Sequence, residues 1–171
     1  MRARGLVMAL AAMLAFGCAP TVTEDKVPAV SRVDRILVDK SAHRMTVFRA
    51  NRPLRTFKVA LGSGGLAPKV SQGDNRVPEG RYVIAGRNPG SAFHLSLKIG
   101  YPTPAQVAAA RARGIDPGGD IMIHGLPNGQ GWVGAAHRQS DWTAGCIAVT
   151  NEEIEWLWQA VPDGTPIDIR G

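Results

Sequence analysis

With 171 residues, the chain is long enough for one domain with a hydrophobic core and short for two. Apolar residues make up 44% and charged residues 20%, which excludes a disordered chain, and 20 glycines with 12 prolines favour turns and short strands over a helical bundle. The net charge of +6 comes from scattered basic residues that are not interleaved with stacking aromatic residues, so the composition argues against nucleic-acid binding.

The first 19 residues have the pattern of an export signal peptide. Arg2 and Arg4 make a basic start, and an apolar run of 11 residues follows at 6–16, too short to span a bilayer. Small residues then follow at 17–19. We therefore expect a signal peptide over 1–19 and an exported protein.

Two kinds of processing fit this signal peptide. Residues 14–18 resemble a bacterial lipoprotein box, in which cleavage precedes Cys18 and the cysteine becomes acylated. A lipid there would anchor the protein to a membrane surface. Cleavage after Ala19 would instead release a secreted chain.

The rest of the chain reads as a polar tether over 20–32 and one mainly β domain over 33–170. Alternating apolar residues between turn signals predict strands at 36–38, 45–48, 55–61, 81–85, 93–99, 121–123 and 166–169. A helix over 103–113 is predicted by Pro104 at its start and Gly114 after its end. A second helix over 151–160 starts with Asn151 as the capping residue.

Cys146 is a candidate nucleophile. It has no partner in the mature chain, because Cys18 is either lost or acylated, and an unpaired thiol in an exported protein is a candidate reactive group. A base such as His124, at the end of an apolar strand, would raise its thiolate fraction. The N–H groups of Gly145 and Cys146 are candidate oxyanion donors. The structural alternatives are a buried small hydrophobic residue and a satisfied core histidine.

Several segments together resemble the L,D-transpeptidase catalytic domain (YkuD) family. The family's His-Gly pair matches His124-Gly125, and its Ser/Thr-x-Gly-Cys-Ile/Val motif matches residues 143–147, followed by Asn151. Residues 73–82, with their Pro-Glu-Gly before a strand, and residues 117–121 also match. The resemblance covers about 34–170.

This resemblance implies a β-sandwich with about two peripheral helices and a peptidoglycan stem peptide as substrate. Cys146 would form a thioester, His124 would be the general base, and the main-chain carbonyl of Gly125 would orient His124. Gly145 and Thr143 would shape the oxyanion site. An amine of another stem peptide, of a D-amino acid or of an envelope lipoprotein would resolve the thioester, in the bacterial periplasm or cell envelope. No metal or other cofactor is implied.

Two departures from the family pattern leave the direction of the reaction open. Ala148 stands where many members carry Arg, and Ala144 where some carry a second His. Both are similar to a subgroup that includes an amidase, so hydrolysis of peptidoglycan peptide or lipoprotein linkages by the same pair is an alternative. A non-catalytic envelope-binding lipoprotein is a third interpretation, against which the intact His124/Cys146 pair argues.

Trp142, His137 and Asn151 are further candidates for the substrate groove, because they flank the motif. A zinc site of His124, His137 and Cys146 would lack the closely spaced ligand pair that is usual in such sites. His43 is expected in a turn and His94 on a strand face.

Overall fold

The computed structural model describes residues 32–171. The predicted signal peptide at 1–19, which contains Cys18, lies outside the described residues. Nearly all of the predicted tether, up to residue 31, lies outside them as well.

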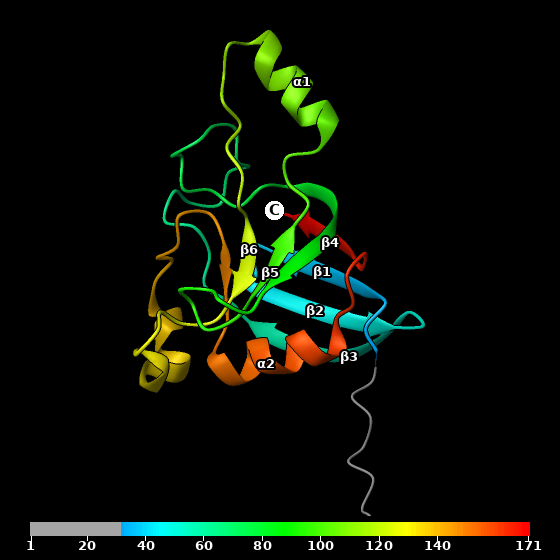
Figure 1. Ribbon diagram of the computed structural model, residues 1–171, viewed down its shortest axis with the longest axis vertical. Helices are drawn as coiled ribbons and strands as arrows, with labels where there is room; N and C mark the ends of the chain where they lie inside the picture. Colours follow the sequence, from blue (N-terminus) through cyan, green and yellow to red (C-terminus); the bar gives the residue numbers. More distant parts are fainter. Residues whose placement is uncertain (1–31) are drawn as a thin grey trace, which may run out of the picture.

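Eight strands form one sheet in the order β3-β2-β1-β8-β4-β5-β6-β7, with helices at its periphery (Figure 1). The strands are β1 (Arg35–Asp39), β2 (Arg44–Arg49), β3 (Arg52–Lys58), β4 (Gly80–Asn88), β5 (Ser96–Ile99), β6 (Met122–His124), β7 (Ile147–Ala148) and β8 (Pro166–Arg170). The helices are α1 (Pro104–Ala112) and α2 (Asn151–Ala160), and a 3₁₀ segment, η1 (Gly131–Gln139), lies between β6 and β7. The predicted mainly β class is confirmed, and η1 was not predicted.

The sheet curls until its two edges meet. Residues 80–83 of β4 pair with β8, whereas residues 84–88 pair with β5, and the register shifts between Ile84 and Gly86. At the other end, Ala60 and Ala148 exchange backbone hydrogen bonds of 3.1 and 2.9 Å, so the chain after β3 pairs with β7. The inner face of the curled sheet therefore encloses a shared core, which includes Ile36, Ile84 and Ile123.

The helix α2 packs on this core. Ile154, Leu157 and Ala160 are its buried residues, which lie on one face at helical spacing. Its N-cap is Thr150, which forms a capping box with Glu153, so Asn151 is the first helical residue and not the cap that the sequence suggested. This difference frees the Asn151 side chain for another role.

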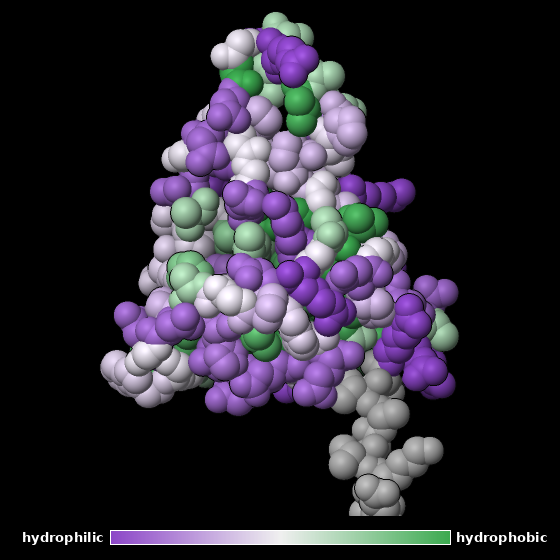
Figure 2. Space-filling view, in the orientation of Figure 1, coloured by the Kyte–Doolittle hydropathy of each residue, from purple (hydrophilic) through white to green (hydrophobic). Residues whose placement is uncertain are grey.

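The helix α1 projects from one end of the molecule (Figure 1), and Ala110 is its one buried residue. On the face drawn in Figure 2, hydrophilic residues predominate and hydrophobic residues appear in small scattered patches. Among residues 32–171, no helix is long and apolar enough to cross a membrane.

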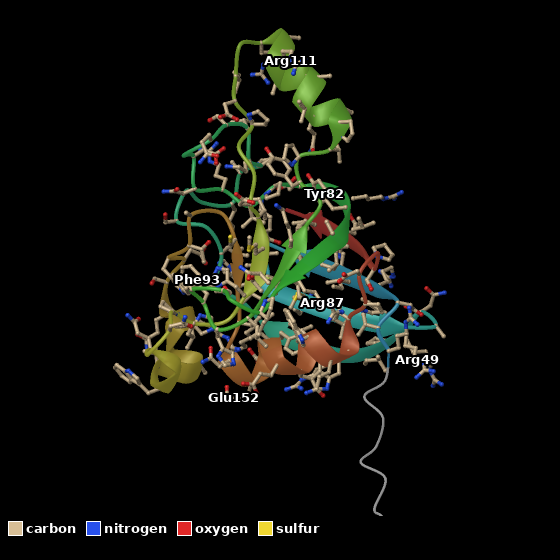
Figure 3. The ribbon with its side chains drawn as sticks, in the orientation of Figure 1. Arg49, Tyr82, Arg87, Phe93, Arg111 and Glu152 are labelled. Atoms are coloured by element: carbon tan, nitrogen blue, oxygen red, sulfur yellow. The ribbon has the colours of Figure 1, made fainter. Side chains whose placement is uncertain are left out.

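The strand predicted over 93–99 begins only at Ser96. His94 has φ 67°, and its N–H donates to Asn128 Oδ1 at 2.9 Å, so residues 93–95 form a turn instead of an extended strand. His94 is therefore not on a strand face. Figure 3 labels Phe93 in this turn, which brings its ring to the end of β6.

A buried lysine holds the segment 73–82 against the sheet. Lys40 is fully buried and donates to Glu79 Oε1 at 2.8 Å and to the Val77 carbonyl at 3.2 Å. A buried ammonium group is tolerated only where it is paired and hydrogen-bonded in this way. Glu79 of the Pro-Glu-Gly sequence thus supplies the counter-charge that fixes the path of segment 73–82. Neighbouring residues of this segment reach the turn that precedes Cys146.

Candidate active site

His124 and Cys146 meet because β6 and β7 are parallel neighbours. His124 ends β6 and pairs in register with Ala148, and Cys146 immediately precedes β7. Both residues line one cavity of about 520 Å³. The two residues singled out in the sequence are therefore brought together in one concave site.

The orientation of His124 leaves one ring nitrogen available as a base. Its Nδ1 lies 2.7 Å from the Gly125 carbonyl oxygen. Because a carbonyl oxygen only accepts, Nδ1 carries the proton and Nε2 keeps its lone pair. Phe93 and Trp142 pack against the imidazole, with ring centroids 4.5 and 5.7 Å away. The role predicted for the Gly125 carbonyl matches this geometry.

The thiol and the imidazole are both favoured in their neutral forms. Burial lowers the pKa of His124, which is 4% exposed, although the hydrogen bond to Gly125 opposes the change. Burial also raises the pKa of Cys146, with a backbone hydrogen bond from Met122 opposing and the Asp120 carboxylate adding to the increase. The resting pair is thus a thiol and a neutral base, and deprotonation must accompany attack.

This state predicts how acylation depends on pH. Acylation of Cys146 should decrease as pH falls through the pKa of His124, because an imidazolium cannot accept the thiol proton. Since burial lowers that pKa, the midpoint of the acid limb should lie below the usual histidine value of about 6.5. The measurement is the rate of Cys146 acylation by a carbapenem between pH 4 and 8; a midpoint above 6.5 would contradict the prediction.

Asn151 binds the backbone that follows His124 and does not line the cavity. Its Oδ1 accepts from the Leu126 N–H at 2.9 Å, and a Cβ atom on Gly125 would lie 2.7 Å from the same oxygen. Asn151 is not among the residues that line the cavity. The groove role suggested from the sequence is therefore corrected: Asn151 fixes the backbone that follows His124.

The turn before Cys146 is held by Thr143. Its hydroxyl donates to the Cys146 carbonyl at 2.8 Å and accepts from the Gly145 N–H at 3.2 Å. The Gly145 N–H is thus already engaged, which differs from the expected pair of oxyanion donors. The Cys146 N–H remains the candidate donor, and Thr143 and Gly145 shape the turn that presents it.

Both the backbone dihedral angle at position 145 and the atoms around it require a glycine there. Its φ is +119°, and a Cβ atom would lie 2.8 Å from the Arg76 carbonyl oxygen. We expect Gly145→Ala to destabilise the domain by roughly 1–3 kcal/mol from backbone strain, plus the cost of the clash, and to slow acylation. Gly65→Ala is the control, because Gly65 has φ +83° but nothing within 4 Å. Equal losses of thermal stability in the two variants would show that the contact with Arg76 is unimportant.

Trp142 separates the catalytic cavity from a second one. It lines both the cavity of Cys146 and a cavity of about 260 Å³ that includes His137. Trp142 Nε1 donates to His137 Nδ1 at 3.4 Å. Burial and the charge of Arg138 lower the pKa of His137 to about 4, so it stays a neutral acceptor. Trp142 thus borders the cavity of Cys146, whereas His137 lines the second cavity.

Three residues with contacts in or near the site were not predicted from the sequence. Phe93 covers His124, Asp120 contacts Cys146 Sγ through its carbonyl oxygen at 3.6 Å, and Asp141 accepts from the Leu61 N–H at 2.7 Å. His43, in the expected turn, contacts Asp141 at 2.9 Å. No local pattern marks these residues, because each contact depends on segments distant in sequence.

Within residues 32–171, no three His, Cys, Asp or Glu side chains converge in a way that could hold a metal ion. His124, His137 and Cys146 therefore do not form the zinc ligand set that was considered from the sequence.

Comparison with known proteins gives a consistent assignment. The putative L,D-transpeptidase YafK of Escherichia coli K12 is 34% identical over 110 residues, which cover 63% of this chain and 37% of YafK. L,D-transpeptidase 1 of Mycobacterium tuberculosis is 27% identical over 134 residues, covering 77% of this chain and 48% of that protein. The chain thus spans less than half the length of these curated relatives.

Solved structures share the fold. A point mutant of the helical cell shape determining protein Pgp2 from Campylobacter jejuni superposes with a TM-score of 0.63 at 25% identity, over 82% of this chain and 47% of that one. Bd1075 of Bdellovibrio bacteriovorus gives 0.55 at 26% identity, over 85% and 50%. The family model for the L,D-transpeptidase catalytic domain (YkuD) matches residues 33–169. Because this match takes in most of the chain, the chain belongs to the L,D-transpeptidase catalytic domain family.

Proposed function

We propose that this protein is a cysteine-nucleophile L,D-transpeptidase that acts on peptidoglycan stem peptides. The observation that carries the proposal is the shared cavity of His124 and Cys146, with His124 Nδ1 tied to the Gly125 carbonyl. Cysteine and histidine in this relation are suited to acyl transfer through a thioester. Membership of the family supports the substrate class.

The proposed reaction has two halves. His124 Nε2 takes the thiol proton while Cys146 Sγ attacks the carbonyl carbon at the L-centre of a diamino acid, and the Cys146 N–H stabilises the oxyanion. The C–N bond to the terminal D-residue breaks, and the leaving amine takes the proton from Nε2. An acceptor amine then attacks the thioester, and the thiol is regenerated.

One observation favours hydrolysis as a second candidate. Ala144, which stands where some family members carry histidine, is exposed and lines the cavity. Its small side chain leaves this wall of the cavity accessible to water. Water in place of the acceptor amine would turn the same thioester into a free carboxylate.

Digestion products of purified sacculi distinguish the two reactions. Transfer yields muropeptides with new cross-links or an added D-amino acid, whereas hydrolysis yields shortened stems or released lipoprotein fragments. Incubation in H₂¹⁸O adds the label only to hydrolytic products. If neither product forms while Cys146 remains reactive toward a carbapenem, peptidoglycan peptides are not the substrate.

The proposed location is the bacterial cell envelope, with the protein anchored through an acylated Cys18. The N-terminal sequence pattern supports this location. Palmitate labelling of the expressed full chain, compared with Cys18→Ala, tests it. A mature N-terminus at Pro20 would contradict lipid anchoring and leave plain secretion.

A further inference from the structure

An exposed ion pair joins Lys98 to Asp120, a residue that lines the cavity of Cys146. Lys98 Nζ is 2.9 Å from Asp120 Oδ1, and the two side chains are 50% and 78% exposed. Exposed pairs of this kind contribute little to folding stability. Both charges also remain accessible to a ligand in solution.

This pair lies next to the nucleophile. Asp120 lines the catalytic cavity, and its carbonyl oxygen contacts Cys146 Sγ at 3.6 Å. Asp120 is the one carboxylate among the residues that line this cavity. Asp120 therefore connects the ion pair to the wall of the cavity that holds Cys146.

Lys98 faces the same side of the sheet as the catalytic residues. It pairs in register with Met122, which lines the cavity, and Ser96 pairs with His124 two residues along. Directly opposed residues on antiparallel strands present their side chains on one face. A substrate over His124 thus has a cation and an anion beside it.

The backbone of Asp120 is held in an uncommon conformation. Its φ is +53°, a left-handed value that non-glycine residues seldom adopt. This turn directs the carbonyl toward Cys146 while the side chain meets Lys98.

We infer that Lys98 and Asp120 bind the α-amino-acid zwitterion at the end of the donor's side chain, when the donor residue is a diamino dicarboxylic acid such as diaminopimelate. The ammonium group would meet Asp120 and the carboxylate would meet Lys98, each exchanging its present partner for the ligand. A lysine side chain, which ends in an ammonium group alone, would leave Lys98 without an anion. This inference rests on the proposed function and adds the residues that select its substrate.

Two synthetic tetrapeptide donors that differ only at the third residue test this selectivity. One carries diaminopimelate and the other lysine, and intact-mass measurements follow thioester formation on Cys146 against donor concentration. We expect the wild-type enzyme to prefer the diaminopimelate donor. Lys98→Gln and Asp120→Asn should each reduce that preference about 10-fold, mainly through KM, the order for a lost hydrogen bond to a charged group.

The ratio of the acylation efficiencies with the two donors distinguishes recognition of the donor's side chain from indirect effects on Cys146. Removing the Asp120 charge also alters the electrostatics at Cys146, but this change affects both donors equally and leaves the ratio unchanged. Lys58→Gln is the matched control, because Lys58 is an exposed lysine on β3 whose register partner, Arg44, does not line the cavity, whereas Lys98 pairs with Met122, which does. Its preference should equal that of the wild type.

Several results would overturn the inference. An unchanged preference in Lys98→Gln and Asp120→Asn would do so, as would equal losses with both donors. A change confined to the decay of the thioester with an acceptor amine would assign the pair to the acceptor instead. If the wild-type enzyme forms no thioester with either donor, the proposed function fails and the inference falls with it.

Discussion

Cys146→Ser is expected to abolish acylation while leaving the fold intact. Serine is nearly isosteric, but its hydroxyl is a far weaker acid than the thiol, and a lone imidazole activates it poorly. His124 has no carboxylate on Nδ1 to assist it, since that nitrogen is committed to the Gly125 carbonyl. The measurement is the amount of carbapenem adduct, followed by intact mass in a quenched time course. Circular dichroism tests whether the variant is folded.

Cys146→Ala is the matched control for this variant. It removes the nucleophile completely, so any adduct that forms on the Ser variant but not on the Ala variant measures the reactivity of the hydroxyl. A folded Cys146→Ser protein that acylates at the wild-type rate would refute the thiol mechanism.

His124→Gln is expected to slow acylation roughly 10²-fold or more, the order of effect for a lost general base. The glutamine amide can still donate to the Gly125 carbonyl, but it cannot accept a proton as Nε2 does. The half-buried thiol, whose pKa is raised, then lacks a base. The residual rate should increase with pH, because hydroxide must replace the imidazole in forming the thiolate.

His94→Asn is the control for loss of a histidine near the site. His94 is partly exposed, pairs with Glu155 at 2.7 Å and has φ 67°, a conformation that asparagine tolerates. We expect it to acylate at nearly the wild-type rate. Full activity of folded His124→Gln would exclude the proposed base.

The hydrophobic pattern predicted most of the sheet. The hairpin of β1 and β2 follows directly from alternating residues, with Ile36, Val38, Met45 and Val47 buried. The same alternation failed at 93–95, because a positive φ at His94 turns the chain although the residues still alternate. The 3₁₀ segment η1 was missed, since its sequence carries glycines at 131 and 134 and no clear apolar period.

The site was predicted where it rests on neighbouring residues and missed where it rests on distant ones. The His-Gly pair and the turn with Gly145 are local: residue chemistry suggested the roles of His124 and Gly145, and the family resemblance suggested that of the Gly125 carbonyl. The role of Asn151 could not, because the cap of α2 shifted to Thr150 and Asn151 turned to the Leu126 N–H. Whether Gly145 keeps a free N–H also depended on the hydroxyl of Thr143.

The amino-acid sequence by itself determined the mainly β class and the family and predicted the candidate nucleophile and its base, because these depend on residue type, periodicity and short motifs. Only the tertiary structure decided that Phe93 covers His124 and that Asp120 contacts the thiol and joins Lys98 at the cavity. These contacts join residues that are far apart in the chain. The curled sheet brings them together, and left-handed backbone conformations at His94 and Asp120 turn the chain there. Their cause is the packing of the whole domain, which no local pattern encodes.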